Sequence, residues 1–282
     1  TLGILIPPSI PMILFGAITS ESVGELFMAG VVPGILLTGL FILYVVLFVS
    51  KKVPSQDPAT WDERIAALRH SSWGLFLPVL IIGVIYTGIF TPTEAAAVGT
   101  IYSLFITFFI YRTLTLRDLP GILVETAKSN AMVLAIVIGA MQYGFILTIM
   151  QIPQQLTELV TGMAVSRWVV FLAINALLLF LGCVLESISI ILITVPLLYP
   201  LILKLGFDPI WFAVIMVINL ELALITPPVG MNLFVIQGIS PGTRMTEILR
   251  GVLPFALLMV LTIAIVAWQP DLATWLPNYL KK

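Results

Sequence analysis

The sequence predicts an all-α polytopic membrane protein that contains broken helices and a re-entrant hairpin. Of its 282 residues 60% are hydrophobic and only 10% are charged, whereas about a quarter of the residues are charged in a soluble globular domain. The charged residues leave gaps that reach or exceed the roughly 20 apolar residues needed to cross a bilayer. Stretches without Asp, Glu, Lys or Arg include residues 26–50, 71–93, 129–157, 222–243 and 251–270.

Composition argues against several function classes. The net charge of −1 gives no indication of a nucleic-acid partner, and the single cysteine, Cys183, excludes an intrachain disulfide and a Cys-rich metal site. The only histidine, His70, lies in a polar segment, where a surface role is the simplest interpretation. No HExxH, GxSxG or P-loop motif is present. We therefore predict that the chain is not an enzyme.

Two proline pairs interrupt apolar segments. They are Pro7-Pro8 in "LIPPS" and Pro227-Pro228 in "ITPPVG". Proline removes a backbone donor and clashes with the preceding turn, so each pair should break its helix. In hydrocarbon the freed carbonyls would cost several kcal/mol each, unless the break lines a cavity enclosed by protein. We predict two broken helices whose interruptions line a binding site, and a kink repaired by neighbouring helices is the alternative.

The proline pairs belong to an internal repeat. "FMAGVVPG" (residues 27–34) follows the first pair at nearly the spacing at which "ILRGVLPF" (residues 248–255) follows the second. Transporters are often built from inverted repeats whose discontinuous helices meet at a site near the bilayer midplane. Only six residues precede Pro7, so we expect the matching part of the first repeat to lie upstream.

Charge and helix-breaking residues divide the chain into six parts. Lys51, Lys52, Arg64 and Arg69 place the largest polar segment in the cytoplasm by the positive-inside tendency. Further on, two short apolar arms flank "LESIS" (residues 185–189), which suggests a hairpin with a polar tip. We expect a broken helix in residues 1–22, a span in 23–50, a polar loop with an interfacial helix in 51–73, spans and interfacial helices in 74–165, the hairpin and second broken helix in 166–244, and a last span and tail in 245–282.

Three carboxylates within apolar segments are candidates for function, because ionisable groups are costly in a membrane. Glu186 sits at the hairpin tip, and the alternative for it is to cap the helix that follows. Glu221 precedes the second proline pair, and its alternative role is a structural hydrogen bond to a neighbouring helix. Glu94 in "TPTE" is expected to cap a helix together with Thr91 or Thr93.

Long stretches resemble the large membrane subunit of TRAP transporters, the DctM family. They are "GILIPPSIPMILFGAITSESVGELFMAGVVPG", "GIFTPTEAAAVGTIYS" and the segment from "LESISIILITVPLLYP" to "ITPPVGMNLFVIQGI". The resemblance implies an inverted-repeat, elevator-type transporter in the bacterial cytoplasmic (inner) membrane. It implies a moving transport domain made of residues 1–22 and 166–244, with the other parts as scaffold. The resemblance places the first hairpin of that domain just before "TLGILIPPS", so we expect it to lie upstream of the given sequence.

The resemblance also implies cargo and partners. Sodium would drive uptake of an acidic solute such as a C4-dicarboxylate, sialic acid or another sugar acid. The expected partners are a small four-helix membrane subunit, a periplasmic solute-binding protein and the lipid bilayer, with no nucleic acid. Another family of ion-coupled anion transporter is the closest alternative, and a channel is a less favoured one.

Sodium is a hard cation and prefers carbonyl, hydroxyl and carboxylate oxygens. The hairpin tip and the broken helices offer such oxygens, so the candidate residues lie there. The candidate Na⁺ ligands are Gly3, Ile6, Ser9, Glu186, Ser187, Ser189, Thr226 and Gly230, and the candidate solute contacts are Pro7, Pro8, Ser187, Pro227 and Asn232.

Overall fold

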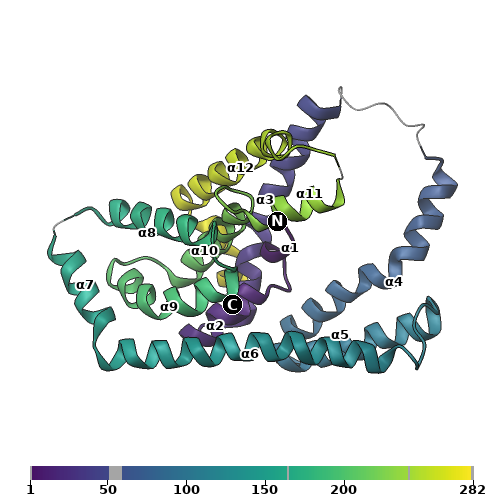
Figure 1. The fold of residues 1–282 in the computed structure, drawn as a ribbon, viewed down its shortest axis with the longest axis horizontal. Helices are drawn as coiled ribbons and strands as arrows, with labels where there is room; N and C mark the ends of the chain where they lie inside the picture. The colour runs from purple at the N-terminus through teal and green to yellow at the C-terminus, as the bar shows by residue number, and fades with distance from the viewer. Residues whose placement is uncertain (1, 51–58, 164, 241, 281–282) are drawn as a thin grey trace. The chain divides into compact units, whose positions relative to one another are not determined.

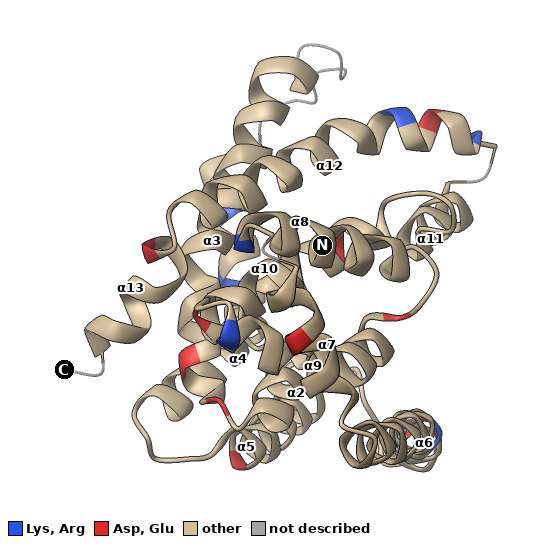
Figure 2. Cartoon of the chain, turned by 90° about the vertical axis from the view of Figure 1, so that its left-hand side faces the viewer, with Lys and Arg blue, Asp and Glu red and all other residues tan. Residues whose placement is uncertain are grey.

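The computed structural model describes residues 2–50, 59–163, 165–240 and 242–280, and every regular element in these ranges is a helix. Seven helical segments are long and apolar enough to cross a membrane, which confirms the predicted all-α polytopic class. Figure 2 shows how sparse the charged residues are along the ribbon. The seven segments are Leu2–Thr19, Val23–Val49, Trp61–Tyr86, Pro92–Ile110, Leu119–Ile149, Ser187–Lys204 and Met245–Trp268.

The helices fall into two compact units, residues 1–44 with 136–282 and residues 45–135, which are described separately. Helix α6 (Leu119–Ile149) begins in the second unit and ends in the first. The first unit holds α1 (Leu2–Leu5), α2 (Ile10–Thr19), α3 (Val23–Tyr44), α7 (Ile152–Gly162), α8 (Arg167–Gly182), α9 (Ser187–Lys204), α10 (Pro209–Leu224), α11 (Met231–Ile239), α12 (Met245–Trp268) and α13 (Asp271–Leu280). The second holds η1 (Val45–Val49), α4 (Trp61–Tyr86), α5 (Pro92–Phe105) and η3 (Ile106–Ile110).

Helix α10 is the core of the first unit (Figure 1). Every residue from Ile210 to Leu224 is buried, as expected for a helix that is apolar on all sides. It packs against α1, α2, α3, α8, α9, α11, α12 and α13. Asp208 caps its start by accepting a hydrogen bond from the Trp211 amide at 2.9 Å, with Pro209 in the first turn. The helix ends just before the second proline pair.

An aromatic cluster fixes the start of α10. The Trp211 ring stacks on Phe171 and on Phe207, with centroid distances of 5.2 Å in both cases. Its indole N–H donates to the carbonyl of Val266 at 2.7 Å, which ties α10 to α12. Trp168 meets the same rings edge-on. The cluster therefore holds α8, α10 and α12 together at one end of the unit.

Helices α8 and α9 form the hairpin that the sequence predicts, with the turn at residues 183–186. A Cβ added to Gly182 would lie 2.5 Å from the Cβ of Ala223, so this glycine lets α8 approach α10 closely. Beyond the turn, the amide of Gly230 donates to the carbonyl of Cys183 at 3.4 Å. The hairpin tip is thus joined directly to the second helix break.

A hydrogen bond links α9 to the loop between α2 and α3. The hydroxyl of Tyr199 donates to Oε1 of Glu21 at 2.7 Å, and the Tyr199 ring meets Phe15 edge-on at 6.3 Å. Glu21 lies in the short turn between the end of α2 at Thr19 and the start of α3 at Val23. This contact connects residues 178 positions apart, and it fixes the hairpin against the first broken helix.

We expect Tyr199→Phe to destabilise the first unit by about 1 kcal/mol, because a partly buried carboxylate oxygen loses its donor while the ring contacts remain. Thermal unfolding in detergent measures the effect. Tyr143→Phe is the matched control, since the Tyr143 side chain is exposed and its hydroxyl has no hydrogen-bond partner among the described residues. Equal melting temperatures for the two variants would contradict a stabilising role of this contact.

The second unit contains an antiparallel pair, α4 and α5. A capping box starts each helix, formed by Thr60 with Glu63 and by Thr91 with Glu94, so the predicted capping role of Glu94 is confirmed. Two expectations differ from the structure. Residues 51–58 of the expected polar loop lie outside the described residues, whereas residues 61–73 form one continuous helix with the span that follows. Likewise the charged segment before residue 130 is continuous with the span in α6.

Candidate functional site

The hairpin tip and both helix breaks meet at one cavity of about 280 Å³ in the first unit. The first break lies between α1 and α2, the second between α10 and α11, and the peptide bonds Pro7-Pro8 and Pro227-Pro228 are both cis. Because residues beside both breaks line the same cavity, the two interruptions face a common space. The cavity is lined by Gly3, Ile4, Pro8, Ser9, Ile10, Pro11, Glu186, Ser187, Ile188, Leu224, Met231 and Asn232.

Helix ends of both kinds line this cavity. The first residues of α2, α9 and α11 contribute to its wall, as do Gly3 and Ile4 of α1 and the last residue of α10, Leu224. Helix N-termini carry partial positive charge and free N–H groups, whereas C-termini carry partial negative charge and free carbonyls. The cavity thus combines donors suited to an anion with oxygens suited to a cation.

The three N-termini differ in how they are capped. Ser9 is buried and caps α2, since its hydroxyl accepts from the Met12 amide at 3.5 Å. Neither Glu186 before α9 nor Gly230 before α11 makes a side-chain capping hydrogen bond. The first-turn amides of α9 and those of Met231 and Asn232 in α11 therefore remain available to a bound anion, whereas the Leu233 amide already donates to the Gly230 carbonyl at 2.8 Å.

Glu186 lies at the hairpin tip with one carboxylate oxygen, Oε2, buried and without a hydrogen-bond partner among the described residues. The alternative interpretation from the sequence, a side-chain cap on the next helix, is not what the structure shows. A buried carboxylate oxygen without a partner is costly. Its position in the cavity wall makes it a strong acceptor for a cation or for a donor on a solute.

The candidate residues divide by their position. Six of them line the cavity: Gly3, Pro8, Ser9, Glu186, Ser187 and Asn232. The other six do not line it: Ile6, Pro7, Ser189, Thr226, Pro227 and Gly230.

The structure gives two of these outer residues another role. The Thr226 hydroxyl donates to the Leu222 carbonyl at 2.7 Å within its own helix end. Gly230 has a φ of 58°, and its amide is used by the Cys183 carbonyl. No contact tests the ion-binding role of any candidate, so these roles stay predictions.

Sequence reasoning did not anticipate the apolar part of the wall. Ile4, Ile10, Ile188, Leu224 and Met231 line the cavity beside the polar residues. Each lies within a few positions of a proline pair or of the tip, but their side chains resemble those of any membrane helix. Only the packing of the helix ends distinguishes them from residues that face lipid.

Glu221 is buried within α10 and does not line the cavity. Nearby, the Asn219 side-chain amide donates to the backbone carbonyl and to Oδ1 of Asn175 at 2.9 and 2.8 Å. This buried pair joins α10 to α8. Asn219 and Glu221 are thus buried in the packed interior of the unit and do not line the cavity.

Comparison with known proteins identifies the architecture. The profile of the family described as "Tripartite ATP-independent periplasmic transporter, DctM component" matches residues 1–272. The chain belongs to the DctM family. This membership agrees with the resemblance of the motifs around both proline pairs. DctM proteins are permease subunits of transporters, and this confirms the prediction that the chain is not an enzyme.

Several named DctM-family relatives are similar over nearly the whole chain. The C4-dicarboxylate TRAP transporter large permease protein DctM of Pseudomonas aeruginosa is 44% identical over 99% of this chain and 66% of its own length. The sialic acid TRAP transporter large permease protein SiaM of Vibrio cholerae is 38% identical over 98% and 65%. The 2,3-diketo-L-gulonate TRAP transporter large permease protein YiaN of Escherichia coli is 36% identical over 95% and 63%. The chain spans about two thirds of the length of these curated relatives.

Proposed function

We propose that this chain is part of the large membrane permease of a TRAP transporter that takes up an acidic solute together with sodium. One observation carries the proposal: the hairpin tip and two broken helices converge on a single cavity that combines helix N-termini, helix C-termini and a carboxylate. Family membership and the acids for which the relatives are named support the transport of an anionic solute.

The chemistry of the cavity suggests why the two cargoes bind together. A solute carboxylate is suited to the uncapped N-termini of α9 and α11, where main-chain N–H groups and partial positive charge meet. The cavity wall contains one carboxylate, Glu186, and no Lys, Arg or His among the residues that the structure describes. An anion entering beside Glu186 is therefore repelled unless a cation is bound, and sodium held by carbonyls, Ser187 and Glu186 supplies the compensating charge.

We propose that movement follows the elevator scheme. Residues 1–22 and 166–244 carry the cavity as a transport domain, and the remaining helices act as its scaffold. A periplasmic solute-binding protein would deliver the solute, and a small four-helix membrane subunit would complete the permease in the bacterial inner membrane. The tripartite periplasmic description of the family supports these partners.

The test is uptake by the intact transporter reconstituted in liposomes with its partner proteins. We expect uptake of a labelled C4-dicarboxylate or sugar acid to saturate and to require an inward sodium gradient. We expect Ser187→Ala to raise the sodium concentration for half-maximal uptake about tenfold, because a polar contact to a charged group contributes about 1.5–3 kcal/mol.

Ser189→Ala is the matched control: the sequence also offers Ser189 as a candidate ligand, but it lies in the same helix, α9, without lining the cavity, so of the two serines we assign the sodium contact to Ser187. Uptake at full rate without sodium would refute the coupling, and non-saturating flux would favour a channel. A sodium requirement altered equally by both serine variants would refute the assignment of Ser187 while leaving the coupling intact.

A further inference from the structure

In the second unit, the apolar stretches of the antiparallel helices α4 and α5 end beside each other. On α4 the last charged residue before a long uncharged stretch is Arg69, and after α5 and η3 the first charged residue is Arg112. Two hydrogen bonds align these positions: the Tyr111 hydroxyl donates to the His70 carbonyl at 2.9 Å, and the Tyr102 hydroxyl donates to the Trp73 carbonyl at 2.8 Å. Trp and Tyr are enriched where a membrane meets water. This end of the pair therefore marks an interface.

The distribution of basic residues identifies the leaflet. At the interfacial end lie Arg64, Arg69, Arg112 and Arg117, whereas the opposite connection, residues 87–94, contains no Lys or Arg. The positive-inside rule places the basic end on the cytoplasmic side. The cytoplasmic leaflet carries anionic phospholipids and has a negative surface potential.

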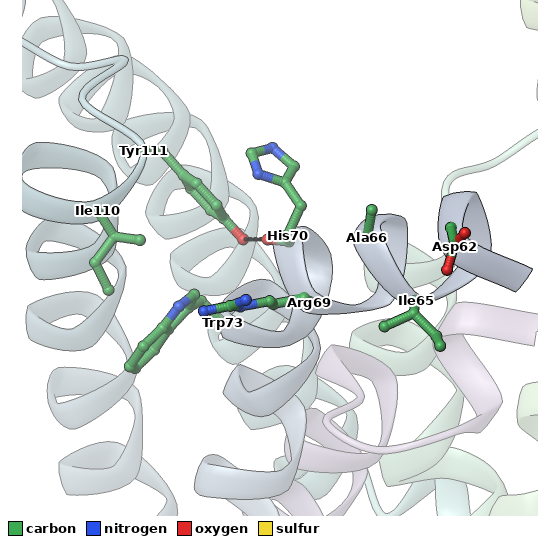
Figure 3. A pocket seen from close by; sticks show the side chains of 8 residues that line it. All are labelled: Asp62, Ile65, Ala66, Arg69, His70, Trp73, Ile110 and Tyr111. Atoms are coloured by element: carbon green, nitrogen blue, oxygen red, sulfur yellow. Dashed lines mark hydrogen bonds between the residues drawn. The ribbon is translucent and has the colours of Figure 1, made fainter.

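A pocket of about 530 Å³ opens at this end (Figure 3). Its polar side chains are Asp62, Arg69 and His70, its aromatic ones are Trp73 and Tyr111, and its apolar ones are Ile65, Ala66 and Ile110. Figure 3 shows the Arg69 and Trp73 side chains extending from α4 on the side where Ile110 lies. The pocket thus places a cationic side chain, Arg69, beside aromatic and aliphatic side chains, an arrangement that suits a ligand with an anionic headgroup and an apolar tail.

The basic side chain of this pocket, Arg69, is free to bind a ligand. Within the described part of the chain the Arg69 guanidinium makes no hydrogen bond or ion pair, although Asp62 lines the same pocket. Arginine presents a planar fork of donors that matches a phosphate. Asp62 lies seven residues earlier, about 10 Å along the helix axis, where it can accept from the hydroxyls of a glycerol headgroup.

From these features we infer that this pocket is a binding site for one anionic phospholipid of the cytoplasmic leaflet. Arg69 holds the phosphate, Trp73 and Tyr111 flank the glycerol backbone, and Ile110 contacts the start of an acyl chain. Nearby Arg64 serves as an internal comparison, because it lies over the Trp61 ring at 5.1 Å and does not line the pocket.

The experiment is a lipid titration of the intact purified protein, followed by native mass spectrometry. Phosphatidylglycerol should bind more tightly than phosphatidylethanolamine or phosphatidylcholine. Arg69→Gln should weaken phosphatidylglycerol binding about tenfold, because it removes the charge-assisted hydrogen bonds from the guanidinium to the phosphate. The affinity of Arg69→Lys for phosphatidylglycerol should lie between those of the wild-type protein and Arg69→Gln, since lysine keeps the charge but lacks the planar fork of donors.

Arg64→Gln is the matched control and should leave phosphatidylglycerol binding unchanged, since both arginines are exposed on the N-terminal half of α4. Unchanged binding by Arg69→Gln, or an equal loss in Arg64→Gln, would overturn the site. A parallel thermal-shift series uses inorganic phosphate alone, which should not stabilise the protein. Stabilisation by phosphate that is lost in Arg69→Gln would show an anion site and refute the lipid.

Discussion

Trp211→Ala should destabilise the first unit more than any other single substitution proposed for this protein. Trp211 is 1% exposed, stacks on two rings and donates its indole N–H to the Val266 carbonyl. Truncating a buried tryptophan costs about 3–5 kcal/mol, because a cavity remains and packing contacts are lost. The orphaned carbonyl adds to this cost. We expect the melting temperature in detergent to fall by roughly 10 °C.

Trp268→Ala provides the matched control for this prediction. Trp268 ends α12, close in sequence to the carbonyl that Trp211 uses, and it is 84% exposed. Trp268→Ala should lower the melting temperature by only a small fraction of the fall expected for Trp211→Ala. Comparable shifts for both variants would mean that the cluster of α8, α10 and α12 does not hold the unit together.

Gly30→Ala should distort the first helix break. A Cβ at this buried position of α3 would lie 2.5 Å from the Leu5 carbonyl oxygen and 2.8 Å from Cε of Met12. The methionine end can move, but the carbonyl belongs to the backbone immediately before the break. Overpacking of this kind costs about 1–3 kcal/mol. Because Leu5 follows Ile4 of the cavity wall and lies two residues before Pro7, we expect uptake to fall more sharply than stability.

Gly39→Ala separates steric effects from helix propensity. Gly39 is in the same helix, but no atom lies within 4 Å of the Cβ that alanine would add. Alanine is favoured over glycine inside a helix by about 1 kcal/mol, so Gly39→Ala should be neutral or stabilising. Full uptake by Gly30→Ala in reconstituted liposomes would show that α3 does not restrain the break.

Much of the fold could be predicted because its signals are local. Proline pairs mark helix breaks through a missing N–H and a steric clash, and "LESIS" between short apolar arms marks a hairpin tip. The caps at Thr91, Glu94 and Asp208 follow from side chains that reach amides three residues away. In each case the sequence contains both partners of the interaction within a few positions.

The site itself was only partly predictable, because it depends on contacts between distant helix ends. The sequence identifies Ser9, Ser187 and Asn232 as polar candidates near breaks, and all three line the cavity. It offers the Thr226 hydroxyl equally, yet that hydroxyl is used by a carbonyl four residues earlier. Which oxygens are consumed by the backbone and which remain free is decided by local geometry that composition does not encode.

The length of α4 shows a different limit. The polar start of this helix suggested an interfacial segment separate from the span, because charged residues rarely continue an apolar helix into the membrane. Between Trp61 and Gly74, however, no proline or glycine interrupts good helix-forming residues, and a capping box fixes the start. The helix therefore continues from the polar segment into the apolar one without a break.

The uncapped amides at the starts of α9 and α11 have a consequence for evolution. A main-chain N–H is present whatever side chain its residue carries, proline excepted, so most substitutions cannot delete it. If these amides bind the solute carboxylate as proposed, a lineage can reshape the surrounding walls to fit new solutes while the carboxylate-binding amides are inherited unchanged. Relatives named for a dicarboxylate, a sialic acid and a diketo acid would then differ in the side chains that shape the site and share the main-chain amides that bind the carboxylate.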